Sequence, residues 1–164
     1  MKEADRIARI NERLLELFPT FRVRLKKVIA NLEAQGVRPR IQDAWRSPED
    51  QRKAHDAGNS ELLFGFHNVT AANGKPESLA VDLLDDDAPL SPSRKYLFQL
   101  AAAAEKAGLT SGIRFGLPPN LRQAVNAAIA AQDWNAKLKI GWDPTHVEPV
   151  GMTVEDARAG RRPA

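Results

Sequence analysis

Two histidines and an aspartate are the residues of this chain whose types could together carry out chemistry. His67 lies in "FGFHN", Asp82 lies in the apolar run "SLAVDLL", and His146 lies in "WDPTHVEP". Neutral imidazole nitrogens and a carboxylate oxygen are a usual ligand set for catalytic zinc, which keeps a fourth position for water. His67, Asp82 and His146 therefore form a candidate site for one Zn²⁺ ion.

Asp82 is the residue of this set that most needs a partner. Alternation along an extended strand places it between Ala80 and Leu84 on one face, so both of its neighbours there are apolar. An isolated carboxylate in that position is costly, or stays protonated, unless a cation or several hydrogen-bond donors meet it. A zinc ion would supply the cation. The alternative is that Asp82 ends the strand and caps a turn before the acids that follow it.

The segment "WDPTHVE" places further acids beside a histidine. In an extended chain His146 and Glu148 share a face, whereas Val147 points into the core. Asp143 lies three residues before His146, and a turn at Asp143-Pro144 could bring its carboxylate back toward the imidazole. A single histidine is more often structural than a ligand, but two acids close together need a cation or a proton to coexist. This arrangement favours a metal site.

The composition limits the class of protein that can carry such a site. A chain of 164 residues is most economically one domain, with a core over about residues 15–150. It has no cysteine, so any metal must be held by His, Asp or Glu. The net charge of +3 is too small to choose between nucleic acid and anionic cell-wall polymers. The basic residues are spread among acids without a nucleic-acid recognition motif, which disfavours nucleic-acid binding.

Hydrophobic periodicity and terminator residues predict the elements that must position these side chains. Helical spacing covers residues 3–16, 18–34, 90–109 and 118–134, with Ser91 or Ser93 as the cap of the third of these. A further helix begins after the cap Ser47 and ends at Gly58. Strands are predicted over 38–44 and 77–84, and two short strands over 137–150 around the Asp143-Pro144 turn. Residues 151–164 are expected to fray.

This order of elements favours an α+β domain with a small antiparallel sheet flanked by helices. A doubly wound α/β fold is the alternative. No apolar run approaches the length needed to span a bilayer, and the charged start "MKEADRIARINERL" does not have the pattern of a signal peptide. We therefore expect a protein made in the cytoplasm, without a membrane span, and monomeric.

Three segments resemble, in the same order, the motifs of a known family. These are "AWRSPEDQRKAHDAG", then "H" with "SLAVDL", then "WDPTHVE". They are similar to elements of the zinc D-alanyl-D-alanine carboxypeptidases and L-alanyl-D-glutamate endopeptidases, a group that includes VanY-like peptidases and phage endolysins and shares its fold with the hedgehog signalling domain. The resemblance covers about residues 15–150. It implies the same α+β fold and one bound zinc ion.

The resemblance also implies roles for individual residues. His67, Asp82 and His146 would be the zinc ligands, and Asp143 the general base, where most members have Glu. Arg46 would bind a substrate carboxylate or stabilise an oxyanion, to which the fixed donors of a guanidinium are suited. The further candidates for substrate binding are Ser47, Gln51 and Glu148.

The chain departs from the family pattern around His67. His67 and Asp82 are fifteen residues apart instead of seven, and Gly65 and Leu79 replace a serine and a glycine of the motif. The insertion over 68–78 must bulge outward, arch over the site, or displace His67 from the metal. His55 is the only other imidazole, and its position within a helix predicts a surface or packing residue.

The long segment from Ser111 to Trp134 has two interpretations. It could form a wall of a substrate cleft, with Arg114 and Phe115 facing the cleft, or it could be a packed helix. We prefer the packed helix.

The leading function is a zinc-dependent peptidoglycan peptidase of the L-alanyl-D-glutamate endopeptidase type, acting as a phage or prophage endolysin on cell-wall stem peptides after its release. The alternatives are a D-alanyl-D-alanine carboxypeptidase or dipeptidase, and a zinc-containing binding module without turnover. Retention of an acid at Asp143 favours catalysis over binding alone.

Overall fold

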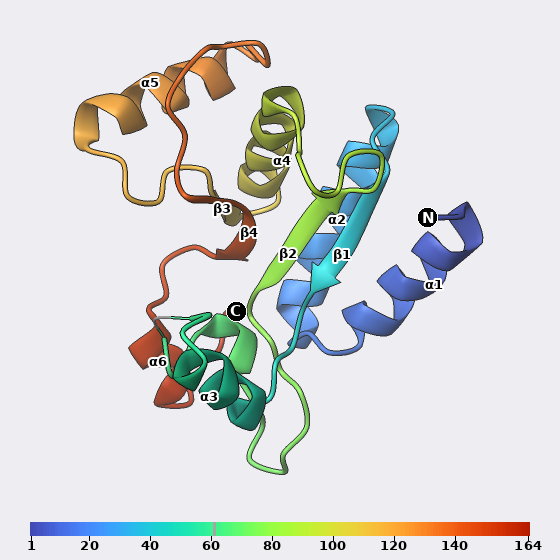
Figure 1. The fold of residues 1–164 in the computed structure, drawn as a ribbon, viewed down its shortest axis with the longest axis vertical. Coiled ribbons are helices and arrows are strands. Elements are labelled where there is room, and N and C mark those ends of the chain that lie inside the picture. The colour runs from blue at the N-terminus through green and yellow to red at the C-terminus, as the bar shows by residue number, and fades with distance from the viewer. Residues whose placement is uncertain (61) are drawn as a thin grey trace.

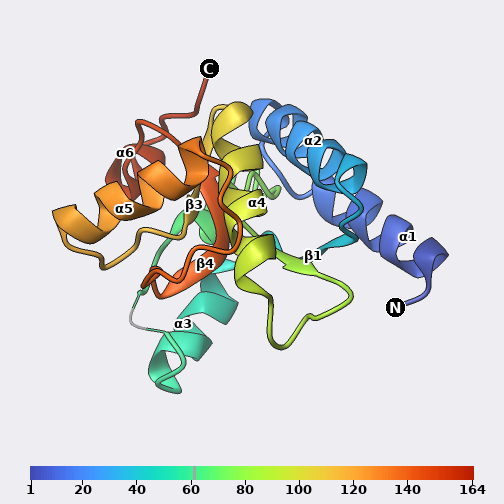
Figure 2. The same cartoon turned by 90° about the horizontal axis from the view of Figure 1, so that it is seen from above.

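A four-stranded antiparallel sheet flanked by helices forms the centre of the computed structural model, which describes residues 1–60 and 62–164. Its strand order is β1-β2-β4-β3, and every neighbouring pair is antiparallel (Figures 1 and 2). The strands are β1 Pro39–Asp43, β2 Val81–Asp85, β3 Leu109–Gly112 and β4 Asp143–Pro149. The helices are α1 Glu3–Leu14, α2 Pro19–Ala34, α3 Pro48–Asp56, α4 Arg94–Lys106, α5 Pro119–Ala130 and α6 Val154–Arg158, with a 3-10 turn η1 at Phe66–Asn68. The α+β prediction is confirmed, and the doubly wound alternative is wrong.

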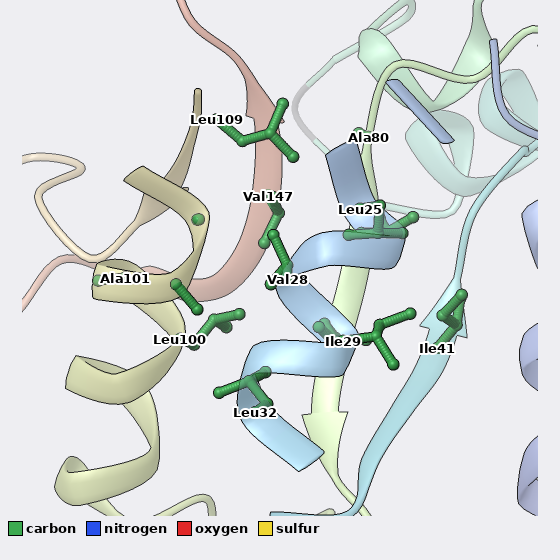
Figure 3. Close-up of a cluster of buried hydrophobic side chains, with 14 of the residues drawn as sticks. Leu25, Val28, Ile29, Leu32, Ile41, Ala80, Leu100, Ala101, Leu109 and Val147 are labelled. Atoms are coloured by element: carbon green, nitrogen blue, oxygen red, sulfur yellow. The ribbon is translucent and has the colours of Figure 1, made fainter. Parts of the chain in front are cut away.

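The hydrophobic core lies between the sheet and the helices α2 and α4. The apolar face of α2 meets α4 and the inward face of the sheet (Figure 3). Strand residues Leu83 and Val147 are fully buried in this core. Because side chains alternate across a strand, their neighbours Asp82 and His146 point to the opposite face of the sheet. The core therefore fixes which face carries the polar cluster.

The helix boundaries follow from capping residues. Ser47 accepts a hydrogen bond from the Asp50 amide (3.1 Å) at the start of α3, and Gly58 follows the helix with φ +76°. Ser93 caps α4 in the same way, which settles the choice between Ser91 and Ser93. No helix in the described ranges is long and apolar enough to cross a membrane.

The strand prediction for residues 137–150 is partly wrong. Residues 137–141 are not a strand, and Asp143 and Pro144 begin β4 instead of forming a turn. The edge partner of β4 is β3, the unpredicted segment "LTSG" directly after α4. Four residues that end in glycine have little strand propensity of their own, so β3 depends on its pairing with β4.

The tail over 151–164 does not fray as predicted. Thr153 and Asp156 form a reciprocal capping box that opens α6. Beyond α6, Arg162 Nε lies 2.8 Å from Glu77 Oε2, and the Thr20 hydroxyl donates to the Pro163 carbonyl (3.1 Å). The tail is held by these polar contacts with segments far away in the sequence.

Candidate metal centre

His67, Asp82 and His146 come together on the face of the sheet opposite the core. Asp82 on β2 lies directly opposite His146 on β4, and His67 approaches from η1. The distance from His67 Nε2 to Asp82 Oδ2 is 3.6 Å, and His146 Nδ1 lies 3.6 Å from Asp82 Oδ1. One ligand atom from each residue lies within 4.8 Å of the other two, so the three residues could hold a metal ion.

The donor set fits zinc. Tetrahedral zinc with ligand bonds of 2.0–2.1 Å has its ligand atoms about 3.4 Å apart. Each imidazole nitrogen lies 3.6 Å from one oxygen of Asp82, close to that value, and the three ligand atoms lie within 4.8 Å of one another. Each imidazole also has an outer hydrogen-bond partner: His67 Nδ1 lies 2.6 Å from the Ala44 carbonyl, and His146 Nε2 lies 2.8 Å from Glu148 Oε2. These bonds orient His67 Nε2 and His146 Nδ1 toward Asp82. Such outer partners are typical of histidines that bind metals.

The neighbouring charges shift the pKa values of His146 and Asp82. Burial lowers the pKa of His146, but the neighbouring carboxylates of Asp82 (3.6 Å) and of Glu148, which is hydrogen-bonded to the ring (2.8 Å), outweigh this and raise it to about 10. Burial raises the pKa of Asp82, but the two imidazoles outweigh this and hold it below its usual range. The raised pKa means that the surrounding acids favour a proton on His146. A metal ion would replace that proton, since imidazole binds metals in its neutral form.

The insertion over 68–78 leaves His67 in the cluster. The insertion folds back on itself through a bridge between Thr70 and Pro76, and it lines a surface hollow together with the segment that joins α1 to α2. Arg162 holds it from the tail through Glu77. The loop bulges outward, as one of the three expectations proposed, and the expectation that it displaces His67 is wrong.

Asn68 keeps η1 in place, although the sequence reasoning did not single it out. Its side-chain oxygen accepts from the Gly65 amide (2.7 Å), and its side-chain nitrogen donates to the Arg46 carbonyl (2.9 Å). The Arg46 amide donates in turn to the His67 carbonyl (2.9 Å). The sequence shows only that an asparagine follows the histidine directly, and its burial becomes visible in the structure alone.

Asp143 lies at the edge of the cluster. Its Oδ2 is 3.8 Å from His146 Nδ1, and burial raises its pKa. Its backbone sits in a tight crossing of β3 and β4, where a Cβ at Gly112 would clash with the Asp143 carbonyl. Gly141 lies in the same crossing and donates to the Ile113 carbonyl (2.5 Å). The two glycines, which the sequence reasoning missed, therefore position the acid.

Arg46 is near the cluster but held by internal partners. Its Nη2 lies 2.7 Å from Asp43 Oδ2, and its Nη1 lies 3.0 Å from Gln51 Oε1. Asp43 stands opposite Asp82 in the register of β1 and β2, so the guanidinium is fixed to the strand next to the cluster. About a third of the Arg46 side chain remains exposed and could meet a ligand.

The other substrate-binding candidates are engaged within the chain. Ser47 caps α3. Gln51 is buried, and its side-chain nitrogen donates to the Leu62 carbonyl (2.6 Å) and to the Ser60 hydroxyl (2.9 Å). Glu148 contacts His146. Ser47 and Gln51 thus support the Arg46 loop, and Glu148 orients an imidazole.

Of the remaining candidates, Phe115 lies beside the cluster, whereas His55 and Arg114 do not take part in it. His55 lies on α3, 3.2 Å from Asp56, and is not part of the cluster. Arg114 turns away to Glu105 (2.6 Å), but the Phe115 ring lies 5.8 Å from the His146 ring. The segment after β3 therefore combines both interpretations, because α5 is a packed helix whereas Phe115 faces the cluster.

Comparison with solved structures identifies known proteins with a similar fold. The chain is similar to the L-Ala D-Glu endopeptidase ChiX of Serratia marcescens, with a TM-score of 0.52 and 22% identity over 91% of this chain and 90% of that chain. A second similar structure is a mutant of the vancomycin resistance D,D-pentapeptidase VanY from a VanB-type resistance cassette, in complex with Zn(II) (TM-score 0.46, 19% identity, 85% of this chain and 74% of that chain). No family model and no curated protein sequence matches the chain. The fold predicted from the three motifs is confirmed.

Proposed function

We propose that this chain is a zinc-dependent peptidase that hydrolyses peptidoglycan stem peptides, of the L-alanyl-D-glutamate endopeptidase type. The observation that carries the proposal is the convergence of His67, Asp82 and His146, with the acid Asp143 beside them. The shared fold with an L-Ala D-Glu endopeptidase supports the choice of substrate class.

Different residues of the chain would bind the metal, transfer the proton and orient a ligand during hydrolysis. Zinc held by His67, Asp82 and His146 would supply a Lewis acid and a water acidic enough to lose its proton near neutral pH. Asp143 would accept that proton and deliver it to the leaving amine, and its raised pKa supports both steps. Glu148 would keep the His146 ring in its ligating orientation.

Arg46 would act on the substrate. Its guanidinium is held by Asp43 and Gln51. The side chain is therefore already ordered and loses little conformational entropy when it binds a ligand. Its exposed part could bind a substrate carboxylate or the developing oxyanion. The D-glutamyl residue of a stem peptide carries such a carboxylate or its amide.

The direct test is digestion of purified peptidoglycan by the zinc-loaded protein, followed by mass spectrometry of the fragments. New N-terminal D-glutamate or D-isoglutamine is the expected product, whereas free D-alanine would assign the chain to the carboxypeptidases. The variant His67→Ala should release nothing, and the matched variant His55→Ala should act as the wild type, because His55 lies outside the cluster. If the wild type released no fragment with zinc, the peptidase proposal would be wrong.

Asp143→Asn separates catalysis from metal binding. We expect hydrolysis to fall by about 10²- to 10⁴-fold, the usual contribution of a general base, while the zinc content stays near one ion per chain. The matched change Asp56→Asn, on the exposed end of α3, should alter neither quantity. Hydrolysis that survived in Asp143→Asn would assign the proton transfer to another group.

We also propose that the protein acts in lysis, reaching the wall after release from the cytoplasm of the producing cell. Expression alone should leave cells intact, and expression together with a protein that permeabilises the inner membrane should lyse them. Asp143→Asn should remove that lysis. Lysis without permeabilisation would contradict this route to the wall.

A further inference from the structure

Trp142 is a large apolar side chain placed in water beside the candidate metal centre. It is 75% exposed and directly precedes Asp143, whereas the other two tryptophans, Trp45 and Trp134, are partly buried. Scattered exposed leucines are common on proteins, but exposed tryptophans are enriched at binding sites. Its exposure next to the candidate metal centre therefore suggests a role in ligand binding.

The indole is held in place and connected to the cluster. The Phe115 ring lies 5.9 Å from the Trp142 ring and 5.8 Å from the His146 ring, so three rings run from the cluster out to solvent. The Trp142 amide donates to the Phe115 carbonyl (3.3 Å). Gly116, with φ +77°, lies beneath the indole, where a Cβ would come within 3.0 Å of it. We name Phe115 and Trp142 together the aromatic ledge.

We propose that the aromatic ledge binds the sugar ring of the peptidoglycan strand to which the stem peptide is attached. The proposal rests on the proposed function and deepens it. In peptidoglycan the L-alanine of the stem is joined to the lactyl group of a muramic acid residue. The sugar therefore begins about two residue lengths, ~7 Å, before the L-alanyl-D-glutamate bond. A pyranose ring presents a face of C–H groups that an indole can cover while the hydroxyl groups stay in water.

The chemistry of the stem peptide itself does not match the ledge. The residues on either side of the L-alanyl-D-glutamate bond carry a methyl group and a carboxylate or amide, and neither covers an indole. The D-alanyl-D-alanine bond lies at the far end of the stem, several residues from the sugar. A sugar subsite so close to the cluster therefore also favours cleavage at the first bond of the stem.

The test compares two substrates that differ in the acyl group on the L-alanine nitrogen, which carries the sugar in one of them and is a simple acetyl group in the other. These are N-acetylmuramoyl-L-alanyl-D-isoglutamine and N-acetyl-L-alanyl-D-isoglutamine, each hydrolysed by the zinc-loaded protein. We expect a lower KM for the first substrate. Trp142→Ala should raise that KM by about tenfold, the order expected for the loss of one aromatic contact, and should leave the KM of the second substrate unchanged. Trp142→Phe should restore part of the difference.

Two controls keep the result specific to the ledge. Leu90→Ala removes a side chain that is 98% exposed beyond the opposite end of β2, and it should change neither KM. Addition of N-acetylmuramic acid should shift the tryptophan fluorescence of the wild type but not that of Trp142→Phe. Unfolding midpoints of all variants should agree, because Trp142 is largely outside the core.

Two results would overturn the inference, and they can be told apart. Equal KM values for the two substrates, or an equal effect of Trp142→Ala on both, would remove the sugar subsite while leaving the peptidase intact. Hydrolysis of neither substrate, together with no fragment from whole peptidoglycan, would overturn the proposed function and the subsite with it.

Discussion

An acid lies near each end of β2, and the two acids have partners of different kinds. Asp86, just past the end of the strand, has a fully buried side chain. Its carboxylate lies 3.1 Å from Arg40, 3.2 Å from Arg38 and 3.3 Å from the amino group of Met1. Asp82, near the start of the strand, has a side chain that is 27% exposed, and its carboxylate lies 3.6 Å from the imidazole of His67 and 3.6 Å from that of His146.

The difference between these partners separates a structural ion cluster from a candidate metal centre. A guanidinium stays charged at every pH a protein experiences and has no lone pair to offer a metal. An imidazole can lose its proton, and the neutral ring then becomes a ligand. Both acids have cationic or ionisable partners, but only the imidazoles beside Asp82 can exchange a proton for a metal ion.

The largest expected effect is the loss of zinc in Asp82→Asn. We expect the zinc affinity to fall by more than about 100-fold, because even the outer partners of metal ligands can contribute that much. Equilibrium dialysis followed by elemental analysis measures it. Asp86→Asn is the matched control and should keep about one zinc ion per folded chain. If Asp82→Asn bound zinc with the affinity of the wild type, Asp82 would not be a metal ligand and would not differ from Asp86 in this respect.

A smaller effect is expected for stability in Asp86→Asn. Loss of the buried carboxylate leaves Arg38 and Arg40 without their shared partner, and we expect the free energy of unfolding to fall by about 2–3 kcal/mol. The cost is below that of a fully buried pair, because both arginines are partly exposed. Urea unfolding of the metal-free protein measures it. Asp87→Asn changes an acid that is largely exposed, and an equal loss of stability in that variant would contradict a special role for Asp86.

The smallest expected effect is that of Glu148→Gln, which tests whether His146 is oriented from outside the cluster. A neutral amide accepts the imidazole hydrogen bond more weakly than a carboxylate. We expect the zinc affinity to fall by about tenfold, at the lower end of the range for outer partners. Titration against a fluorescent zinc chelator measures it, with Glu155→Gln on the exposed side of α6 as the control. A loss as large as that in Asp82→Asn would make Glu148 a ligand itself.

Several elements could be predicted because their signals are local. The Ser47 cap and Gly58 end point of α3 depend on residues a few positions apart, and both were found. The alternation of Val147 and His146 likewise follows from a single extended segment. In contrast, α6 has only five residues, too few to be stable alone, and it forms together with the contacts of Arg162 with Glu77.

The sequence by itself determined which side chains could carry the chemistry, His67, Asp82, Asp143 and His146, and the periodicity that places most of the helices. Only the tertiary structure decided that the long loop leaves His67 in the cluster, that β2 and β4 align Asp82 with His146, and that Glu148 supports an imidazole. The physical reason is how far apart in the sequence the interacting residues are. Caps and periodicity depend on neighbouring residues, whereas strand register depends on packing of the whole sheet, where a slip of one residue would turn Asp82 into the core.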